Sequence, residues 1–547
     1  MISSRSLKNL PALLLVTLFF LGCQREAKHH AVDDNGAGQT QAPIPDSGIA
    51  STNPAATGFA KLDLGPAGIS LEALKSTTRG YTGTLFESLS SDSTGIDFVN
   101  PIDQSHPQKH LYASAFACGG VAIGDVDNDG WPDIFFTSGP KKNRLFRQTA
   151  PMKFTDVTEA AKLDSGDVWS AGAAMVDIEN DGDLDIYICN YDTPNHLFIN
   201  NGDGTFAEQA QQFGVDFVGA GHTPTFCDYD RDGDLDFYLM TNFYWDPRGK
   251  TDKPITGMIK SRPSIMPGFE KYFGITKVLR GAQPGTLLIV HDAVGQPDRL
   301  VRNNGDGTFT DVSKAAGIEG NGKANSATWW DYNEDGWPDI YVGNDYKDPD
   351  RLYRNNGDGT FTNTTREMVP HTTWYSMGAD FADLNGDGAL DFLIADMSGT
   401  NHFKQKTAMG AMSDNAEFLN TAIPRQYMRN AVYVNSRGGR FIEAAHLAGL
   451  ANSDWTWTVR LADFDNDGRV DVFFSNGMSR DFNDSDNPEL AILNLGETEW
   501  DKHLRAKTPK LRQQNIAFRN AGRLSFEDVS KDWGLDHVGM SFGDRGL

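Results

Sequence analysis

Short apolar triplets recur along the chain, each set between polar and glycine-rich stretches. In every triplet three β-forming residues follow one another without polar alternation, which is typical of a short strand buried on both faces. An acidic stretch directly precedes each triplet. The six triplets are Ile134–Phe136, Ile186–Ile188, Phe237–Leu239, Ile340–Val342, Phe392–Ile394 and Val472–Phe474.

A glycine-rich phrase follows three of the triplets between two further apolar runs. It stands in Leu197–Phe206, Leu300–Phe309 and Leu352–Phe361, with weaker versions in Val432–Phe441 and Ile516–Phe526. Asn-Gly-Asp-Gly between apolar runs predicts a hairpin, because Asn and Gly accept positive φ. Each unit therefore predicts four short antiparallel strands, and a repeat of about 50 residues with four strands is typical of a propeller blade. We expect an all-β propeller of about seven four-stranded blades, six of them clear and one incomplete.

The acidic stretch has one form, D-x-[DNE]-x-D-G-x-x-D, in all six copies. Oxygens at positions 1, 3 and 5 of a tight turn converge on one point, Gly at position 6 permits the bend, position 7 offers its carbonyl and position 9 closes the cage. Calcium takes six to eight oxygen ligands at about 2.3–2.6 Å, which suits this set. The expected ligands are Asp125, Asp127, Asp129 and Asp133; Asp177, Glu179, Asp181 and Asp185; Asp228, Asp230, Asp232 and Asp236; Asp331, Asn333, Asp335 and Asp339; Asp383, Asn385, Asp387 and Asp391; and Asp463, Asp465, Asp467 and Asp471.

Two other interpretations of these loops compete with calcium binding by hairpins. An EF-hand needs a bidentate Glu at position 12, and here that position is apolar in every copy, as at Phe136 and Ile188. An Asp-Asn-Gly turn can also form without a metal. Repetition of one spacing in six copies favours metal binding over a simple turn. Clustered carboxylates also repel one another strongly without a cation. We expect about six structural Ca²⁺ ions.

Composition narrows the class of protein further. The 547 residues carry a net charge of -25 with a pI near 4.8, which argues against a nucleic-acid partner, since such proteins show a basic patch or stripe. An aromatic content of 11% is too high for a disordered acidic chain. Cys118, Cys189 and Cys227 are odd in number and lie in or beside expected strands, which favours buried thiols over disulfides.

Residues 1–23 form an expected targeting segment. Arg5 and Lys8 precede a short apolar core, which ends at Leu21-Gly22-Cys23 and resembles a bacterial lipoprotein signal with Cys23 as the lipidated residue. An ordinary signal peptide cut nearby is the alternative. Residues 24–75 are rich in Ala, Gly, Pro, Ser and Thr, which predicts a flexible tether. We expect an exported bacterial lipoprotein at the outer membrane or cell surface, bound to the membrane through its lipid anchor only.

The repeats resemble the FG-GAP/VCBS propeller repeats, a class that includes the integrin α-subunit head. The chain is also similar to bacterial lipoproteins related to cartilage acidic protein, whose propellers often precede an ASPIC/UnbV module. The segments that carry this resemblance are Thr94–Asn100, Gly119–Asp125, Gln426–Asn430 and Asp454–Trp457. The resemblance spans residues 76–547 and implies a calcium-stabilised binding scaffold, without fixing a ligand or a reaction.

The two ends of the repeat region depart from the family pattern. No ASPIC/UnbV module fits after residue 530, and His537–Asp544 predicts the start of a seventh inner strand. Arg79–Phe98 resembles the closing hairpin of a blade. We expect either a ring closed by both termini and one strand short, or a truncated product.

Long insertions and aromatic residues predict a ligand face. The insertions, near 243–297, 397–428 and 478–513, fall between second and third strands, and the first holds eight Lys or Arg against four Asp or Glu, so it suits an acidic partner. Packing between blades is the alternative role of the aromatic residues. The aromatic candidates are Trp169, Trp329, Trp330, Trp374, Tyr375, Trp455 and Trp457.

These patterns favour a binding or assembly scaffold for an extracellular glycan or protein. The alternatives are a carbohydrate-active enzyme of lyase or dehydratase type on the long-loop face, and a purely structural surface protein. Gly539–Gly543 fits G-x-S-x-G, but that motif needs a following helix and a later acid and His, and only four residues follow Gly543. We therefore predict no catalytic residue.

Overall fold

The computed structural model describes residues 62–63, 70–71 and 84–541, with gaps at 102, 104, 114–118, 248–252, 281–284, 319, 409–417, 419–420, 479–480, 482–483, 485 and 487–510. The chain divides into two units, residues 1–75 and 76–547. In the first unit, β1 (Leu62–Asp63) pairs with β2 (Ser70–Leu71) in antiparallel fashion. Cys23, the expected signal and most of the expected tether lie outside the described residues.

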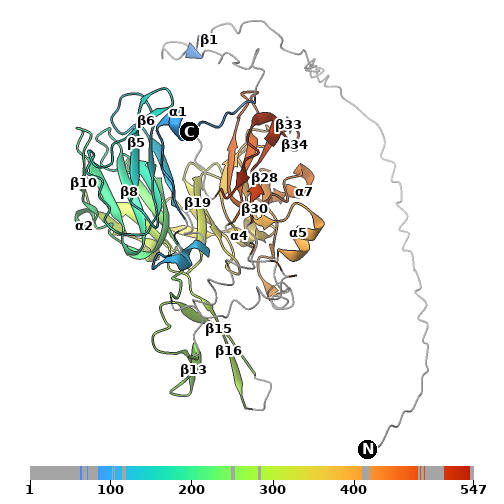
Figure 1. Cartoon of the computed structure of the whole chain (residues 1–547). Helices are drawn as coiled ribbons and strands as arrows, with labels where there is room; N and C mark the ends of the chain where they lie inside the picture. Colours follow the sequence, from blue (N-terminus) through green and yellow to red (C-terminus); the bar gives the residue numbers. More distant parts are fainter. Residues whose placement is uncertain are drawn as a thin grey trace, which may run out of the picture. The chain divides into compact units, whose positions relative to one another are not determined.

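The second unit is built from four-stranded antiparallel sheets that follow one another along the chain (Figure 1). Six sets of four strands lie within the described residues, and we number them as blades 1 to 6. Pairing of Ala220 with Tyr191 joins blades 2 and 3 into one eight-stranded sheet, and β26 (Met397–Ser398) adds a fifth strand to blade 6. The propeller of four-stranded blades predicted from the sequence is thus confirmed. The blades are β3 (Val121–Gly124), β4 (Asp133–Phe136), β5 (Arg144–Ala150) and β6 (Lys153–Asp156); β7 (Ser170–Val176), β8 (Asp185–Pro194), β9 (His196–Asn200) and β10 (Phe206–Glu208); β11 (Val218–Cys227), β12 (Asp236–Thr241), β17 (Arg299–Asn303) and β18 (Phe309–Asp311); β19 (Ala324–Trp330), β20 (Asp339–Asn344), β21 (Arg351–Asn355) and β22 (Phe361–Asn363); β24 (Ala379–Ala382), β25 (Asp391–Ile394), β28 (Ala431–Asn435) and β29 (Phe441–Glu443); and β30 (Asp454–Ala462), β31 (Asp471–Asn476), β33 (Ile516–Gly522) and β34 (Ser525–Asp528).

The apolar triplets form the second strand of each blade, as predicted. In blades 2 to 5 all three residues of the triplet are buried, because another sheet packs on each face. In blade 1 Ile134 and Phe136 are only half-buried, and so is Phe473 in blade 6. These partly exposed residues mark the two blade faces that border the incomplete seventh position.

Hydrophobic cores lie between neighbouring blades. Tyr187 of blade 2 packs against Phe237 of blade 3, with ring centroids 5.3 Å apart. Phe392 of blade 5 packs in the same way against Tyr341 of blade 4, at 4.9 Å. Blades 2 to 5 bury both faces against their neighbours, so the blades stabilise one another around the ring.

The segment before blade 1 occupies the outer position of a seventh blade. The Phe86 N–H donates to the Trp533 carbonyl of blade 6 at 2.8 Å, and a Cβ on Gly534 would lie 2.5 Å from the Phe86 carbonyl. A Cβ on Gly95 would lie 2.4 Å from the Phe154 carbonyl in the same way. Phe86 therefore takes the place that Phe154 has in blade 1, and the N-terminal segment lies between blades 6 and 1.

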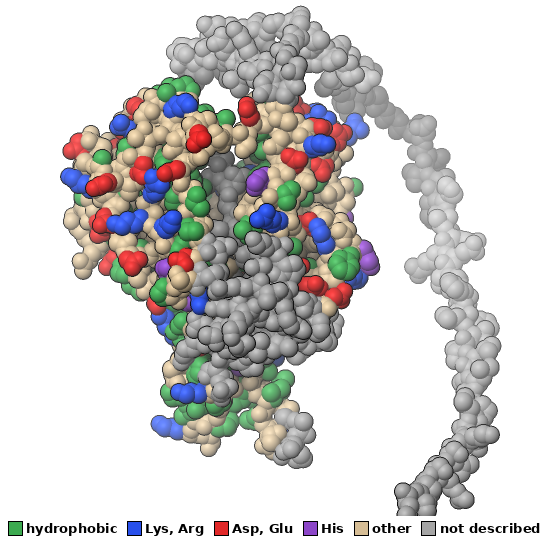
Figure 2. All heavy atoms as spheres, in the orientation of Figure 1, with side chains coloured by type: hydrophobic (Ala, Val, Ile, Leu, Met, Phe, Trp, Pro, Cys, Tyr) green, Lys and Arg blue, Asp and Glu red, His purple; other side chains and the backbone are tan. Residues whose placement is uncertain are grey.

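The insertion between β12 and β17 forms two hairpins. They pair β13 (Thr256–Ile259) with β14 (Arg262–Ile265), and β15 (Phe273–Arg280) with β16 (Leu287–Ala293). Figures 1 and 2 show them extending from the blades at the bottom of the view. The 397–428 insertion contains α5 (His402–Thr407), and 478–513 lies mostly outside the described residues. No helix in the described part of the chain combines the length and apolarity needed to cross a membrane.

Candidate metal sites and the opposite end of the ring

The six acidic loops share one backbone conformation. Position 6 is a glycine with positive φ in every loop, from +83° at Gly388 to +99° at Gly233. Position 4 also has positive φ, as at Asn128 and Glu334. Two left-handed residues in one short turn bend the chain back on itself, so that the acidic side chains of the turn face a common point.

The first aspartate of each loop is fixed by the turn itself. Asp125 accepts the backbone N–H groups of Asp129 at 3.0 Å and Gly130 at 2.8 Å, one on each carboxylate oxygen. The other five loops repeat this pair of hydrogen bonds at positions 5 and 6. The position 1 carboxylate is therefore held over the loop before any ion binds.

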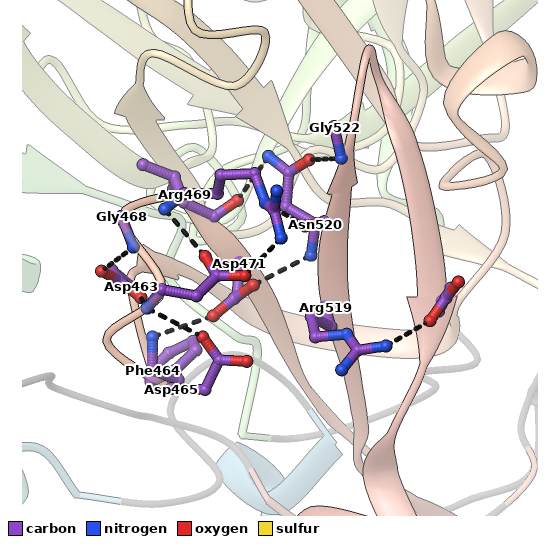
Figure 3. Close-up of polar contacts among 12 residues, drawn as sticks. Asp463, Phe464, Asp465, Gly468, Arg469, Asp471, Arg519, Asn520 and Gly522 are labelled. Atoms are coloured by element: carbon purple, nitrogen blue, oxygen red, sulfur yellow. Dashed lines mark hydrogen bonds and ion pairs between the residues drawn. The ribbon is translucent and has the colours of Figure 1, made fainter. Parts of the chain in front are cut away.

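The ninth residue of each loop is a fully buried aspartate that joins the loop to the third strand. In blade 6 Asp471 accepts the N–H groups of Phe464 and Asn520, both at 2.9 Å (Figure 3). Burial raises the pKa of Asp471 to about 6 and that of Asp236 to about 8, although two backbone hydrogen bonds lower it in each case. Neighbouring loop carboxylates add to the rise, because like charges disfavour ionisation. A bound cation would favour the ionised form of these carboxyls, and so it would oppose the effects of burial and of the neighbouring charges on their pKa.

Three loops bring acidic oxygens within 4.8 Å of one another. These are the loops of Asp125, Asp127 and Asp133; Asp228, Asp230 and Asp236; and Asp463, Asp465 and Asp471.

Buried oxygens without a donor test whether a cation fits these loops. Asp127 Oδ1 and Asp230 Oδ1 are buried and have no hydrogen-bond partner. The other oxygen of Asp127 pairs with Arg147 at 3.1 Å. A buried acceptor left unsatisfied costs roughly 1–3 kcal/mol. The side-chain atoms that could bind a metal in these loops are all oxygens, the ligand type that hard divalent cations prefer. The residues therefore fit such an ion.

Blade 2 adds a residue that the sequence pattern did not assign as a ligand. Asp183 stands at position 7, where only a backbone carbonyl was expected, and its Oδ1 is buried without a hydrogen-bond partner. Burial raises the pKa of Asp183, and the neighbouring Asp181 raises it further. The sequence does show this difference. Position 7 is acidic only in the loops of blades 2 and 3, at Asp183 and Asp234, and it is apolar or basic in the other four loops.

Asparagines at the end of the third strand link each loop to the loop of the preceding blade. Asn200 Nδ2 donates to the Val126 carbonyl at 2.8 Å, and Asn520 Nδ2 donates to the Leu384 carbonyl at 3.0 Å. Blades 3, 4 and 5 make the same contact through Asn303, Asn355 and Asn435. The sequence pattern suggested only hairpins at these asparagines, and their role between blades was missed.

The predicted ligand-face tryptophans lie in two places. Trp169, Trp374 and Trp455 lie near the connections between second and third strands and are buried, at 2%, 0% and 9% exposure. Trp330 pairs with Asp339 across β19 and β20, so it and its neighbour Trp329 lie beside an acidic loop. This is the end of the blade opposite the expected ligand face. A ligand-binding role for these residues stays a prediction.

A cavity of about 810 Å³ lies along the inner strands of the blades. Trp329 and Trp457 line it, each with its indole N–H bonded to a backbone carbonyl, of Thr225 at 3.2 Å and of Gly477 at 2.7 Å. The buried Ser326 Oγ also lies at the lining and has no hydrogen-bond partner.

Aromatic side chains stack where β20 ends, at the end of the ring opposite the acidic loops. We call Tyr346, Trp374 and Tyr375 the aromatic ledge. The ring centroids of Tyr346 and Tyr375 lie 5.6 Å apart, and those of Trp374 and Tyr375 lie 5.2 Å apart. Tyr346 and Tyr375 are half-buried, whereas Trp374 is fully buried.

Charged groups flank the aromatic ledge. Lys323 is 6% exposed, and its Nζ lies 5.6 Å from the Tyr346 ring. Asp345 Oδ1 is buried without a hydrogen-bond partner, and burial raises the pKa of this carboxyl to about 6, against the lowering effect of Lys323. Rigid aromatic rings beside convergent polar groups are typical of a binding site.

These features define a class of protein: a repeat propeller whose blades each carry an acidic hairpin loop able to hold a metal ion. The model of the FG-GAP-like repeat matches residues 125–188, 177–239, 287–342, 331–394 and 418–474, which cover just over half of the chain. The chain belongs to this family. Each match begins at or before an acidic loop and ends in the second strand of a blade.

Named relatives share the repeat region at low identity. Human cartilage acidic protein 1 is 22% identical over 343 residues, 56% of this chain and 47% of that protein, and the mouse protein is 24% identical over 338 residues, 56% and 48%. The match thus spans about half the length of these relatives. Among solved structures, an Agrocybe aegerita lectin that recognises non-reducing terminal N-acetylglucosamine is similar with a TM-score of 0.36 at 14% identity, covering 76% of this chain and 82% of the lectin.

Proposed function

We propose that this protein is an exported, lipid-anchored scaffold whose propeller is stabilised by calcium and binds an extracellular ligand at the aromatic ledge. Calcium is the ion proposed for the acidic loops because their donors are carboxylate, amide and carbonyl oxygens at the spacing that calcium loops use. The buried, unpaired oxygens of Asp127, Asp183 and Asp230 support an ion in the loops of blades 1 to 3. The predicted anchor at Cys23 supplies the surface location.

One observation carries the binding role. The half-buried rings of Tyr346 and Tyr375 stack beside the buried Lys323 and the unpaired Asp345 carboxylate. A planar aromatic surface with adjacent donors and acceptors suits the apolar face and hydroxyl groups of a sugar ring. A glycan is therefore the ligand that this site favours, ahead of a protein.

A glycan array screened with the protein in calcium tests the proposal. We expect binding that the variants Y346A and Y375A each reduce by about fivefold or more, since aromatic contacts contribute roughly 1 kcal/mol or more apiece. The matched control is Trp131→Ala, which removes an exposed aromatic side chain at the acidic end of the ring and should bind as the parent does.

The outcomes separate the candidate functions. Equal loss of binding in Trp131→Ala and in the two tyrosine variants would overturn the ledge as the site. Retention of a purified extracellular protein in place of any glycan would move the proposal to a protein ligand. Incubating each bound glycan with the protein, followed by mass analysis, tests the carbohydrate-active enzyme alternative through released products.

A further inference from the structure

The hairpins of the first insertion form a two-ribbon projection, which we call the arm: β13, β14, β15 and β16. Its base is well anchored. Phe269 is 3% exposed, and Lys271 binds Asp192 of blade 2 at 2.6 Å while lying 4.1 Å from the Tyr244 ring. At Gly295 a Cβ would lie 2.1 Å from the Gly322 carbonyl, so the return strand passes tightly against the ring. The arm therefore projects from a fixed base.

The outer half of the arm exposes apolar side chains on both of its faces. Leu279 pairs with Leu288 and Val278 pairs with Ile289, and successive residues of a strand point to opposite faces. Six apolar residues of the two hairpins are exposed. Their exposed fractions are 52% for Met258, 37% for Ile259, 44% for Val278, 41% for Leu279, 48% for Leu287 and 54% for Leu288. A two-stranded ribbon has little stability of its own in water, and several exposed apolar side chains on one projection mark an interaction site.

Basic side chains lie near these exposed apolar residues in the sequence. Lys260, Arg262 and Arg280 are exposed and make no ion pair within the described residues. Between residues 253 and 293 the chain carries six Lys or Arg against two acidic residues, Glu270 and Asp292, although the whole chain has a net charge of -25. Figure 2 shows the arm with apolar and basic side chains and little acidic surface.

We propose that the arm is a membrane-docking element that inserts the exposed apolar residues of β13, β15 and β16 into an anionic lipid bilayer. A protein groove would cover one face of a ribbon, whereas lipid surrounds an inserted tip and covers both. The basic residues lie where they meet phosphate headgroups, and the acidic remainder of the chain is repelled by the same surface. This second membrane contact goes beyond the predicted lipid anchor and does not depend on the proposed glycan site.

Vesicle co-sedimentation tests the inference. The blades belong to a unit separate from residues 1–75, so residues 24–547 are used, which removes the predicted apolar leader and the Cys23 anchor. We expect binding to vesicles of phosphatidylcholine with 30% phosphatidylglycerol, and weak binding to phosphatidylcholine alone. The triple variant K260Q/R262Q/R280Q should bind the anionic vesicles about a hundredfold less, at about fivefold for each basic residue near the surface.

Two further variants separate insertion from simple charge attraction. L279S/L288S keeps the charge of the arm and should lower binding about tenfold, because apolar burial contributes alongside the electrostatic attraction. The matched control I442S/L447S changes two exposed apolar residues of blade 5, 58% and 78% exposed, and should bind as the parent does. Melting curves in calcium verify that every variant is folded.

Three results would overturn the membrane-docking inference. The first is equal sedimentation of the parent with neutral and anionic vesicles. The second is unchanged binding of L279S/L288S, and the third is a loss in I442S/L447S as large as that in the arm variants. Loss of glycan binding has no bearing on this test, so the two proposals fail separately.

Discussion

Replacing Asp298 by asparagine should stabilise the propeller in a pH-dependent way. Asp298 is 5% exposed; it accepts the Thr241 N–H at 2.7 Å and the Tyr238 hydroxyl at 2.9 Å. Blade 2 has Asn195 at the same place, which accepts the Asn190 N–H at 2.9 Å and donates to the Tyr187 hydroxyl at 3.0 Å. The variant D298N can therefore adopt an arrangement that the protein already uses.

The magnitude follows from the pKa of the buried carboxyl. Burial raises the pKa of Asp298 from 3.8 to about 6, although its hydrogen bonds and Arg351 lower it. The folded state then binds more protons than the unfolded state between about pH 4 and 6, so stability falls as pH rises through that window. The full penalty above pH 6 is about 3 kcal/mol, at 1.36 kcal/mol per pKa unit. D298N removes this penalty at pH 8 and changes little at pH 4.

Calorimetric melting at pH 4, 6 and 8 measures the difference. With roughly 2.1 cal/mol/K of unfolding entropy per residue, a unit of about 450 residues shifts its Tm by about 1 °C per kcal/mol, so D298N should melt about 3 °C higher at pH 8. Asp306→Asn, an exposed turn residue of the same blade, is the control and should leave Tm unchanged at all three values. A lower Tm for D298N at pH 8, or an offset that is independent of pH, would refute the reasoning.

The remaining predictions concern the acidic loops. At free calcium ten times Kd, each loop adds about 1.4 kcal/mol, so EDTA should lower Tm by about 8 °C for six loops, and scanning calorimetry with and without the chelator checks this. Asp230→Asn should remove one calcium ion from the titration stoichiometry yet leave Tm in EDTA equal or higher, because it also removes like-charge repulsion; Asp306→Asn should do neither. Asp183→Ala should weaken one calcium site by about tenfold in titration calorimetry, whereas a structural role alone would lower Tm equally in calcium and in EDTA.

The blade architecture was predictable because it depends on local sequence. A strand buried on both faces needs an unbroken apolar run such as Phe392–Ile394, and a loop with a left-handed turn at position 6 needs glycine there. Both signals recur together in six copies with the same internal spacing, so one misassigned copy would not have hidden the pattern. The half-burial of Phe136 was not predictable, because it depends on what occupies the seventh position.

The contacts between blades were not predictable from the repeat pattern. Asn520 lies 136 residues from Leu384, whose carbonyl it contacts. The spacing within one repeat does not indicate which residue of a neighbouring blade a side chain contacts. The aromatic ledge was missed in part for the same reason. Trp374 and Tyr375 were predicted to face a ligand, but the stacking with Tyr346 joins blade 4 to blade 5, and it buries Trp374 while the two tyrosines stay half-buried.

Hydrogen bonds couple the acidic loops of blades 1 to 5 to the next blade of the ring. In blade 1 the buried Asp133 accepts the Val126 N–H at 3.0 Å, and the carbonyl of the same Val126 accepts from Asn200 of blade 2. An ion that holds Asp133 ionised therefore fixes the peptide groups to which the next blade binds. In blade 1, Gln148 stands where the other blades have the asparagine that contacts the preceding loop. The described residues before blade 1 contain no acidic loop that Gln148 could contact. Calcium at these sites should strengthen the interfaces between blades more than the blades themselves, so its removal should loosen the ring before it unfolds any single sheet.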